Sequence, residues 1–524
     1  MSRQVYTVKI AGPAGMGVKS AGQILAEVLV NLGFHLFDYT EYPSLVRGGH
    51  NTYQISFSTS PVYFIHRTVD LFISLAPNHW QIHQNELAEN AVIISPPDFP
   101  LNDLAGKVGN LVTANTVCLG AAATILGLNP MSFKDIIKAH FGKYAEINWT
   151  AFQIGFDFAV RNFNQSKIKV KMPDKSVKLS HNYNDGNEAA GWGFLKAGGD
   201  FYTAYPMTPA SGILHFLAAH QGDYHLQVVH PEDEIAAINL AAGAAYAGAR
   251  AATGTSGGGF ALMTEAVSLL GMAGIGAVVY LISRPGPATG LPTWTSQGDL
   301  LFAIHAGHGE FPKIVLSPGS QQESFELSRL AINLAVKHQL PVIFLSDKML
   351  GESAADTTDL SAEKTIMTPL PRILPGTKGQ EYLVNSYEHD DQGFSTEDAE
   401  VTKKMVEKRL AKIKNVLPDL PSSTTLRSVS GSTKLIITWG SVTGAVREAG
   451  LEDYDILPIK TLWPIDPQLE TVINSYQSVV VVENNASSQL TTLLKSQFNF
   501  KPDRIITKYD GRPFFPEEIY ERCK

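Results

Sequence analysis

Short apolar runs alternate with longer helical patterns along most of this 524-residue chain. Residues 5–11 form an apolar, β-rich run that leads into a glycine-rich turn, and residues 19–34 place apolar side chains at helical spacing. Further strand patterns lie at 53–58 and 91–95. A strand, a glycine turn and a helix open a doubly wound α/β fold, so we expect such a domain over residues 1–165.

The same alternation recurs in two later regions, which predicts three doubly wound α/β domains in all. The second domain is expected over 187–350 and the third over 433–524. Residues 166–186 are polar and lysine-rich, as in a linker, and residues 351–432 become acidic and then helical, which predicts a connecting segment. The strands expected in the second and third domains are 200–205, 225–230, 249–256, 277–283, 311–317, 341–347, 434–440, 454–460 and 478–484.

One stretch is apolar enough to require a membrane test. Residues 266–283 carry no charge and reach the length of a spanning helix. Glycines interrupt the stretch and its end is β-branched and aromatic, so a helix followed by a buried parallel strand explains it better. The N-terminus has no pattern typical of a secretory signal. We therefore expect a soluble protein.

Composition narrows the class of protein. The net charge is -8 and charged residues are 18%, so a nucleic-acid-coating surface is not expected. A hydrophobic fraction of 44% excludes disorder. The chain has 2 cysteines, Cys118 and Cys523. This number suits the reducing cytoplasm, and it is too small for the four thiolates that an iron–sulfur cluster usually takes.

The first candidate site is the glycine turn after the first predicted strand. Backbone N–H groups near Gly12, Gly15 and Gly17 could face an anion at a helix N-terminus. The spacing departs from the dinucleotide fingerprint and Pro13 removes one donor, so a tight turn explains the pattern equally well. Arg47 precedes two glycines, which suits either an anionic ligand or an ordinary surface turn.

The second candidate is the segment Tyr205-Pro206-Met207-Thr208-Pro209, which follows a predicted strand. The two prolines restrict the backbone on both sides of Thr208. A rigidly held hydroxyl just past the carboxyl end of a strand is where open α/β sheets place ligands. A proline turn that caps the next helix is the alternative.

Three further motifs place polar groups near predicted strand ends. Glu234 opens a helix of small apolar residues, where it could cap the helix or exchange a proton in a dry pocket. Ser256 and Gly257 begin a flexible, donor-rich turn after a strand. Arg284 ends an apolar strand, and its planar guanidinium matches a carboxylate ligand.

Taken together and in this order, the motifs resemble one family. The chain is similar to the α subunits of 2-oxoacid:ferredoxin oxidoreductases that carry the family's γ domain at the N-terminus, as in the 2-oxoglutarate type. The matching segments are GPAGMGV (12–18), RGGHN (47–51), DGNEA (185–189), YPMTP (205–209), EDEIAAI (232–238), TSGGGF (255–260), SRPGPATG (283–290), SYEHDDQG (386–393) and EKRLAKI (407–413).

The resemblance implies a fold and a reaction. The first domain would be the γ-type domain, the middle one a pyrimidine-binding domain for thiamine diphosphate, and the last a transketolase C-terminal-like domain. The reaction would be oxidative decarboxylation of a 2-oxoacid, best 2-oxoglutarate, with coenzyme A to give acyl-CoA and CO₂. Ferredoxin would receive the electrons.

The resemblance also assigns roles to residues. Glu234 would exchange a proton with N1′ of the cofactor's aminopyrimidine, Thr208 would contact substrate and cofactor, and Arg284 would lie near the substrate carboxylate. The remaining cofactor-binding candidates are then Tyr205, Pro206, Ser256 and Gly257 for thiamine diphosphate, with Gly12, Gly15, Gly17 and Arg47 in the γ-type domain that helps to hold coenzyme A.

One expected motif is absent. In this family a Gly-Asp-Gly holds the diphosphate and Mg²⁺, and this chain has none. We therefore expect a partner, the β subunit, to supply the Mg²⁺ site and the [4Fe-4S] cluster in a cytoplasmic heterodimer or heterotetramer. The alternatives are an NAD(P)-dependent dehydrogenase built on the first glycine turn and a non-catalytic scaffold subunit of the same fold.

Overall fold

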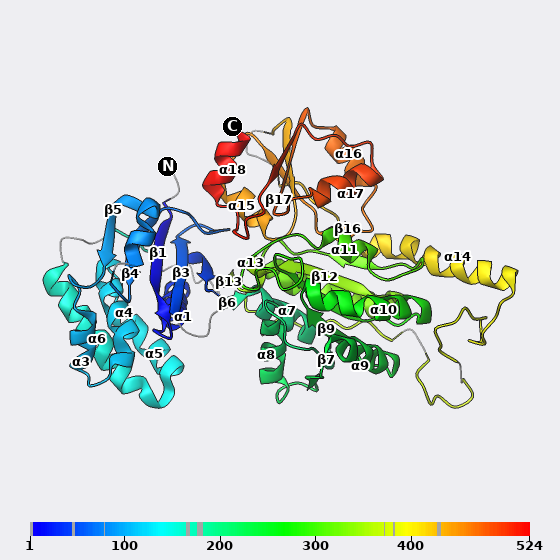
Figure 1. Ribbon diagram of the computed structural model, residues 1–524, viewed down its shortest axis with the longest axis horizontal. Helices are drawn as coiled ribbons and strands as arrows, with labels where there is room; N and C mark the ends of the chain where they lie inside the picture. The colour runs from blue at the N-terminus through cyan, green and yellow to red at the C-terminus, as the bar shows by residue number, and fades with distance from the viewer. Residues whose placement is uncertain are drawn as a thin grey trace. The chain divides into compact units, whose positions relative to one another are not determined.

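A computed structural model describes residues 4–43, 48–77, 79–163, 168–174, 182–370, 373–380, 383–426 and 431–524. These residues divide into two compact units. The first contains residues 1–184, 353–359 and 515–521, and the second contains residues 185–352, 360–514 and 522–524. The α/β class with three sheets is confirmed (Figure 1).

The first unit is built on a mixed sheet of order β5-β4-β1-β3-β2-β13-β6. β1 pairs in parallel with β4 but antiparallel with β3, and β3 pairs antiparallel with β2. The strands are β1 (Tyr6–Ala14), β2 (His35–Glu41), β3 (Gly48–Ser58), β4 (Val69–Ser74), β5 (Leu87–Ile94), β6 (Asn182–Asp185) and β13 (Ala354–Thr357).

Helices cover the first sheet and enclose its main core. That core joins the inner faces of β1 and β3 to apolar side chains of α1, α4 and α6, and Figure 1 shows α3 to α6 gathered on one side. The helices are α1 (Val18–Asn31), α2 (His79–Ile82), α3 (Leu101–Gly106), α4 (Ala114–Ile125), α5 (Lys134–Phe141) and α6 (Ala145–Asn162).

The second unit contains a sheet of order β16-β11-β12-β10-β9-β7-β8, in which only β16 runs antiparallel to its neighbour. Every residue of β9 and β10 is buried, because helices cover both faces. The strands are β7 (Phe201–Thr203), β8 (Gln227–Val229), β9 (Ala251–Thr255), β10 (Val278–Ser283), β11 (Ile314–Leu316), β12 (Val342–Asp347) and β16 (Thr461–Trp463).

The uncharged stretch 266–283 divides as its pattern predicts. The helix ends at Ala273, Gly274 adopts the left-handed conformation as its C-cap, and the buried strand β10 follows. No described helix combines the length and the hydropathy that crossing a membrane requires. The helices of this region are α7 (Gly186–Lys196), α8 (Ser211–His220), α9 (Glu234–Tyr246), α10 (Gly257–Ala273), α11 (Leu300–His305), α12 (Gln321–His338), α13 (Lys348–Gly351) and α14 (Ala399–Val416).

A third, fully parallel sheet of order β15-β14-β17-β18 follows in the same unit. Its inner side chains share one core with those of the middle sheet. The strands are β14 (Lys434–Thr438), β15 (Asp455–Pro458), β17 (Ser478–Glu483) and β18 (Arg504–Thr507), and the helices are α15 (Val442–Glu448), α16 (Gln468–Asn474) and α17 (Gln489–Gln497). The last helix, α18 (Pro516–Cys523), belongs largely to the first unit.

Candidate active site

The carboxyl ends of β7, β9 and β10 bring most of the predicted site residues to one edge of the middle sheet. Thr208 follows β7, Ser256 and Gly257 follow β9, and Arg284 follows β10. Glu234 begins α9, the helix that connects β8 to β9. Because parallel strands end at the same edge, residues scattered over 77 positions of the sequence become neighbours.

Glu234 is the most unusual of these residues. Its side chain is 4% exposed, and Oε1 has no hydrogen-bond partner among the described residues. Asp233 caps the helix instead, accepting a hydrogen bond of 2.8 Å from the backbone N–H of Ala236. The helix-capping interpretation therefore belongs to Asp233. A buried carboxyl oxygen without a donor is costly in an ordinary core, so it indicates a site for a ligand that brings the donor.

A glycine makes room for this carboxyl group. A Cβ atom on Gly259, in the first turn of α10, would lie 2.6 Å from Oε1 of Glu234 and would also collide with the Thr255 hydroxyl. Thr255 in turn donates to the sulfur of Met207 at 3.8 Å. The carboxyl group of Glu234 thus lies close to the first turn of α10, next to the end of β9, and Thr255 at that strand end contacts the proline-flanked segment after β7.

The proline-flanked segment is held from two sides. The guanidinium of Arg284 donates to the carbonyl oxygen of Thr208 at 2.7 Å. The amide of the buried residue Asn187 donates to the carbonyl of Pro209 at 2.9 Å. Tyr205 stays partly exposed, with its ring 5.9 Å from that of His230. Thr208 and Pro209 are therefore fixed at the sheet edge, and Tyr205 and Pro206 precede them in the same segment.

An acid that the sequence patterns did not single out completes the edge. A Cβ atom on Gly257 would lie 2.9 Å from both carboxylate oxygens of Asp299, and Oδ2 of Asp299 has no hydrogen-bond partner in the described chain. Burial raises the pKa of Asp299 while Ser283 and Arg284 lower it, and burial lowers the pKa of Arg284. Asp299 is the only charged residue between Arg284 and Glu310, a signal that could have identified it.

The glycines of the first unit have a different setting. Gly12 lies inside β1, not in the predicted turn, and a Cβ atom there would be 3.0 Å from Cβ of Leu75. Gly15 has open space around it and a φ of 89°, and Gly17 is the N-cap of α1 with a φ of 76°. The amide of Asn115 donates to the carbonyl of Gly17 at 3.3 Å.

The structure thus gives these glycines mainly close packing and turn geometry, with open space only at Gly15. Arg47 lies outside the described residues. The neighbouring His50 contacts His79 at 2.7 Å, between their Nδ1 atoms, and also contacts His83.

Comparison with known proteins gives the family. The model described as "Pyruvate ferredoxin/flavodoxin oxidoreductase" matches residues 7–158, and that described as "Pyruvate flavodoxin/ferredoxin oxidoreductase, thiamine diP-bdg" matches residues 193–408. The chain is 29% identical to the 2-oxoacid:ferredoxin oxidoreductase subunit alpha of Saccharolobus solfataricus, covering 98% of this chain and 96% of that one.

Two other similar proteins have names that specify 2-oxoglutarate. The 2-oxoglutarate synthase subunit KorA of Archaeoglobus fulgidus is 35% identical, over 44% of this chain and 67% of that one. A solved structure of 2-oxoglutarate:ferredoxin oxidoreductase from Magnetococcus marinus, with 2-oxoglutarate, coenzyme A and succinyl-CoA bound, matches with a TM-score of 0.92. It is 27% identical, covering 100% of this chain and 99% of that one. The chain therefore belongs to the 2-oxoacid:ferredoxin oxidoreductases, as an α subunit of that enzyme family.

Proposed function

We propose that this chain is the α subunit, with a fused γ-type domain, of a thiamine diphosphate-dependent enzyme that oxidatively decarboxylates 2-oxoglutarate. Coenzyme A would take up the acyl group and ferredoxin the electrons. The single observation that carries the proposal is the unpartnered Oε1 of buried Glu234 at the carboxyl edge of the middle sheet. The printed names of several relatives support the choice of 2-oxoglutarate.

The residues around Glu234 fit the aminopyrimidine half of the cofactor. The Oε1 atom of Glu234 has no hydrogen-bond donor among the described residues and needs one. Because Gly259 has no side chain, the carboxyl group has room to stay in its present position. When bound, thiamine diphosphate supplies the carbon nucleophile and stores the electrons that decarboxylation releases. Glu234 would hold and exchange a proton at N1′ of the aminopyrimidine, in a pocket that excludes water. Ser256, whose buried hydroxyl has no partner among the described residues, would lie against the same ring system together with Gly257.

Arg284 and Thr208 would position the substrate. One guanidinium nitrogen of Arg284 holds the Thr208 carbonyl, which leaves the rest of the fork for the carboxylate next to the 2-oxo group. The Thr208 hydroxyl would contact the bound substrate and cofactor, and Tyr205 and Pro206 would line the entrance. Asp299 would balance the charge of Arg284 before the substrate arrives.

Coenzyme A would be held with the help of the first unit. Supporting this, Gly15 is surrounded by open space and the N-terminus of α1 has no side-chain cap. Backbone N–H groups between Gly12 and Gly17, with Arg47, would face the anionic part of the co-substrate.

A partner β subunit would carry the Mg²⁺ site and the iron–sulfur cluster. Both cysteines of this chain are buried, and burial raises their pKa values, that of Cys523 to about 11. Such thiols are poor cluster ligands because cluster iron binds thiolate. Within the described residues, no group of three or more His, Cys, Asp or Glu side chains is arranged to hold a metal ion.

The test is turnover by the assembled complex. The chain is co-expressed with its partner and supplied with thiamine diphosphate, Mg²⁺ and coenzyme A, and reduction of a one-electron acceptor is followed. 2-Oxoglutarate is expected to give the highest kcat/KM, ahead of pyruvate and branched 2-oxoacids. Absence of turnover with all of them would overturn the enzymatic proposal, and a preference for another acid would overturn only the substrate.

A further inference from the structure

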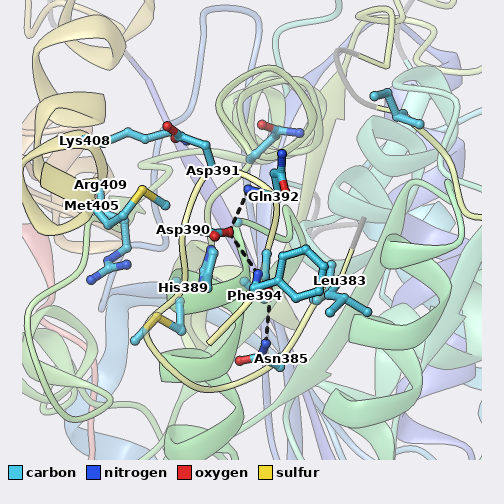
Figure 2. Close-up of a pocket in the computed structure, with 18 of the residues that line it drawn as sticks. Leu383, Asn385, His389, Asp390, Asp391, Gln392, Phe394, Met405, Lys408 and Arg409 are labelled. Atoms are coloured by element: carbon cyan, nitrogen blue, oxygen red, sulfur yellow. Dashed lines mark hydrogen bonds and ion pairs between the residues drawn. The ribbon is translucent and has the colours of Figure 1, made fainter. Parts of the chain in front are cut away.

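A cavity lies in the same unit, away from the sheet edge. It has a volume of about 960 Å³ and lies between α14, residues 383–394 and the C-terminal ends of α9, α10 and α12 (Figure 2). α10 begins at the candidate active site and ends at this cavity, so the length of the helix, about 25 Å for 17 residues, separates the two. The cavity is within the size range of sites for small organic molecules.

One wall of the cavity is a loop, residues 383–394, that is held by hydrogen bonds between its own residues. Oδ1 of Asp390 accepts hydrogen bonds from the backbone N–H groups of Gln392 at 2.9 Å and Phe394 at 3.0 Å, and the amide of Asn385 donates to the carbonyl of Gly393 at 3.2 Å (Figure 2). Gly393 has a φ of 87°, and a Cβ atom there would collide with the backbone of Leu383. The loop is therefore prearranged and depends on a glycine at this position.

An ion pair fixes this loop to the opposite wall. Arg409 of α14 donates to both carboxylate oxygens of Glu388, at 2.9 and 2.6 Å. Such a two-bond contact fixes orientation as well as distance. The cavity thus has two walls that are joined before any ligand arrives.

The fixed loop presents apolar side chains to solvent. Phe394 is 56% exposed and Leu383 is 53% exposed, and both line the cavity. Met272 and Met405 line it as well. Exposed apolar groups that face a concave surface are typical of ligand sites, because a ligand with an apolar body removes them from water.

The cavity also contains a cation whose charge is not neutralised. Nζ of Lys412 donates to the C-cap carbonyl of Gln339 at 2.8 Å, which uses one of its three N–H donors. Arg409 and Lys408 pair with Glu388 and Asp391, whereas no described carboxylate pairs with Lys412. Burial and the two neighbouring cations lower the pKa of Lys412 to about 8. An anionic ligand would neutralise this charge.

We propose that this cavity is a second ligand site, which takes an amphipathic organic anion. Its apolar or aromatic body lies against Phe394 and Leu383, and its carboxylate or phosphate group pairs with Lys412. The site is distinct from the one that surrounds Glu234 and does not depend on the reaction assigned to it.

Calorimetry with three matched probes on the assembled complex tests the site. 1-Naphthoate, 1-naphthyl phosphate and 1-naphthol share one ring system and differ only in the head group. We expect the two anions to bind at least about tenfold more tightly than the alcohol, the difference that one charge-assisted contact supplies. The anion that binds more tightly shows whether the site prefers a carboxylate or a phosphate head group. Equal binding of all three probes, or binding of none, would overturn the proposal.

Variants locate the binding in this cavity. Lys412→Met is expected to reduce anion affinity to that of the alcohol, and Lys412→Arg to retain most of it. Phe394→Ala should lower the affinity for all three probes. Lys404→Met is the matched control, because Lys404 is on the same helix, pairs with Asp391 and does not line the cavity. Unchanged affinity in Lys412→Met, in a complex that stays folded by circular dichroism, would contradict the assignment.

Discussion

Two buried glutamates, one in the middle sheet region and one in the C-terminal sheet, have opposite surroundings. Glu483 ends β17 and is fully buried, with four donors on its carboxylate. These are the amide of Asn485, the backbone N–H groups of Leu490 and Thr491, and the Thr491 hydroxyl, at 2.8 to 3.3 Å. Glu234 is almost as buried, yet its Oε1 has no donor within the described chain.

The difference separates a structural carboxylate from a functional one. Glu483 satisfies the N-terminus of α17, so the fold explains its burial. The fold does not explain the burial of Glu234, because an unpaired buried oxygen costs on the order of 1–3 kcal/mol. Burial alone therefore says little about function, whereas a buried carboxyl oxygen without a partner at the carboxyl edge of a parallel sheet lies where a ligand is expected.

The largest expected effect comes from replacing the carboxyl group of Glu234 by an amide. Glu234→Gln keeps the shape of the side chain but cannot exchange a proton, so turnover should fall by a factor on the order of 10²–10⁴. Thermal unfolding of the complex should change little, since no described hydrogen bond to Oε1 is lost. Steady-state acceptor reduction and calorimetric unfolding measure the two effects.

Glu483→Gln is the matched control for this experiment. It replaces an acceptor by a donor opposite backbone N–H groups, so it should lower the free energy of unfolding by about 2 kcal/mol. The kcat of the folded complex should remain near that of the unsubstituted chain. If Glu234→Gln instead lowered stability and spared turnover, the proposed contrast between the two glutamates would be wrong.

A third buried carboxyl group adds a pH dependence to the comparison. Asp38 of β2 accepts hydrogen bonds from the hydroxyls of Tyr53 and Tyr183 and from the backbone N–H of Ala354. Burial nevertheless raises its pKa from 3.8 to about 6. The folded state therefore holds a proton that the unfolded state releases between these pH values, so stability decreases as pH rises through this window.

The contribution of Asp38 to this decrease is on the order of 3 kcal/mol. Asp38→Asn should remove it, so the difference between the two pH profiles of unfolding should change between about pH 4 and 6 and be flat above. Hydrogen exchange of the β2 and β3 amides reports on the unit that contains Asp38. A difference profile that is flat throughout would show that burial does not control this carboxyl group.

Adding one methyl group at Gly259 tests the pocket of Glu234 from the other side. In Gly259→Ala the new Cβ would lie 2.6 Å from Oε1, so the carboxyl group must move, at a cost of about 1–3 kcal/mol of stability and a large part of the activity. Gly258→Ala is the control, since the nearest atom to its Cβ is 3.9 Å away. Equal turnover in the Gly259→Ala and Gly258→Ala variants would show that Gly259 is not part of the active site.

The sequence allowed the middle region to be predicted well, for physical reasons. Buried parallel strands such as β9 and β10 require uninterrupted apolar or small residues, and this pattern is visible without any partner strand. Once these strands are predicted, Ser256 and Arg284 are identified as the residues at their carboxyl ends. The residue patterns also indicated Thr208 and Glu234, to which the family motifs then gave roles, and the structure brings both to the same edge.

The parts that were missed depend on contacts between distant residues. β13 has four residues and pairs with β2, more than 300 positions earlier, so its own pattern could not identify it. β2 contains Asp38 at a buried position, and only its distant donors, the hydroxyls of Tyr53 and Tyr183 and the backbone N–H of Ala354, explain its presence there. Asp299 reaches the site edge through the loop after β10, and its isolated charge in the sequence marks the residue without specifying that path.

The smallest expected effect concerns a carboxylate that is partly exposed. Nε2 of His140 lies 2.8 Å from Oε1 of Glu27, and this hydrogen bond raises the pKa of His140. The pair therefore contributes stability below the unfolded pKa of about 6.5, and loses it as pH rises through the higher folded value.

His140→Gln should accordingly lower the free energy of unfolding at pH 5.5 but hardly at pH 8.5. Both side chains are partly solvated, so water screens the pair and the loss should stay below about 1 kcal/mol. Denaturant titrations at the two pH values measure it. If His140→Gln lowered the free energy of unfolding as much as is expected for Glu483→Gln, exposure to water would not weaken the contribution of a carboxylate in this protein. The contrast between Glu234 and Glu483 would then have to rest on their activity difference alone.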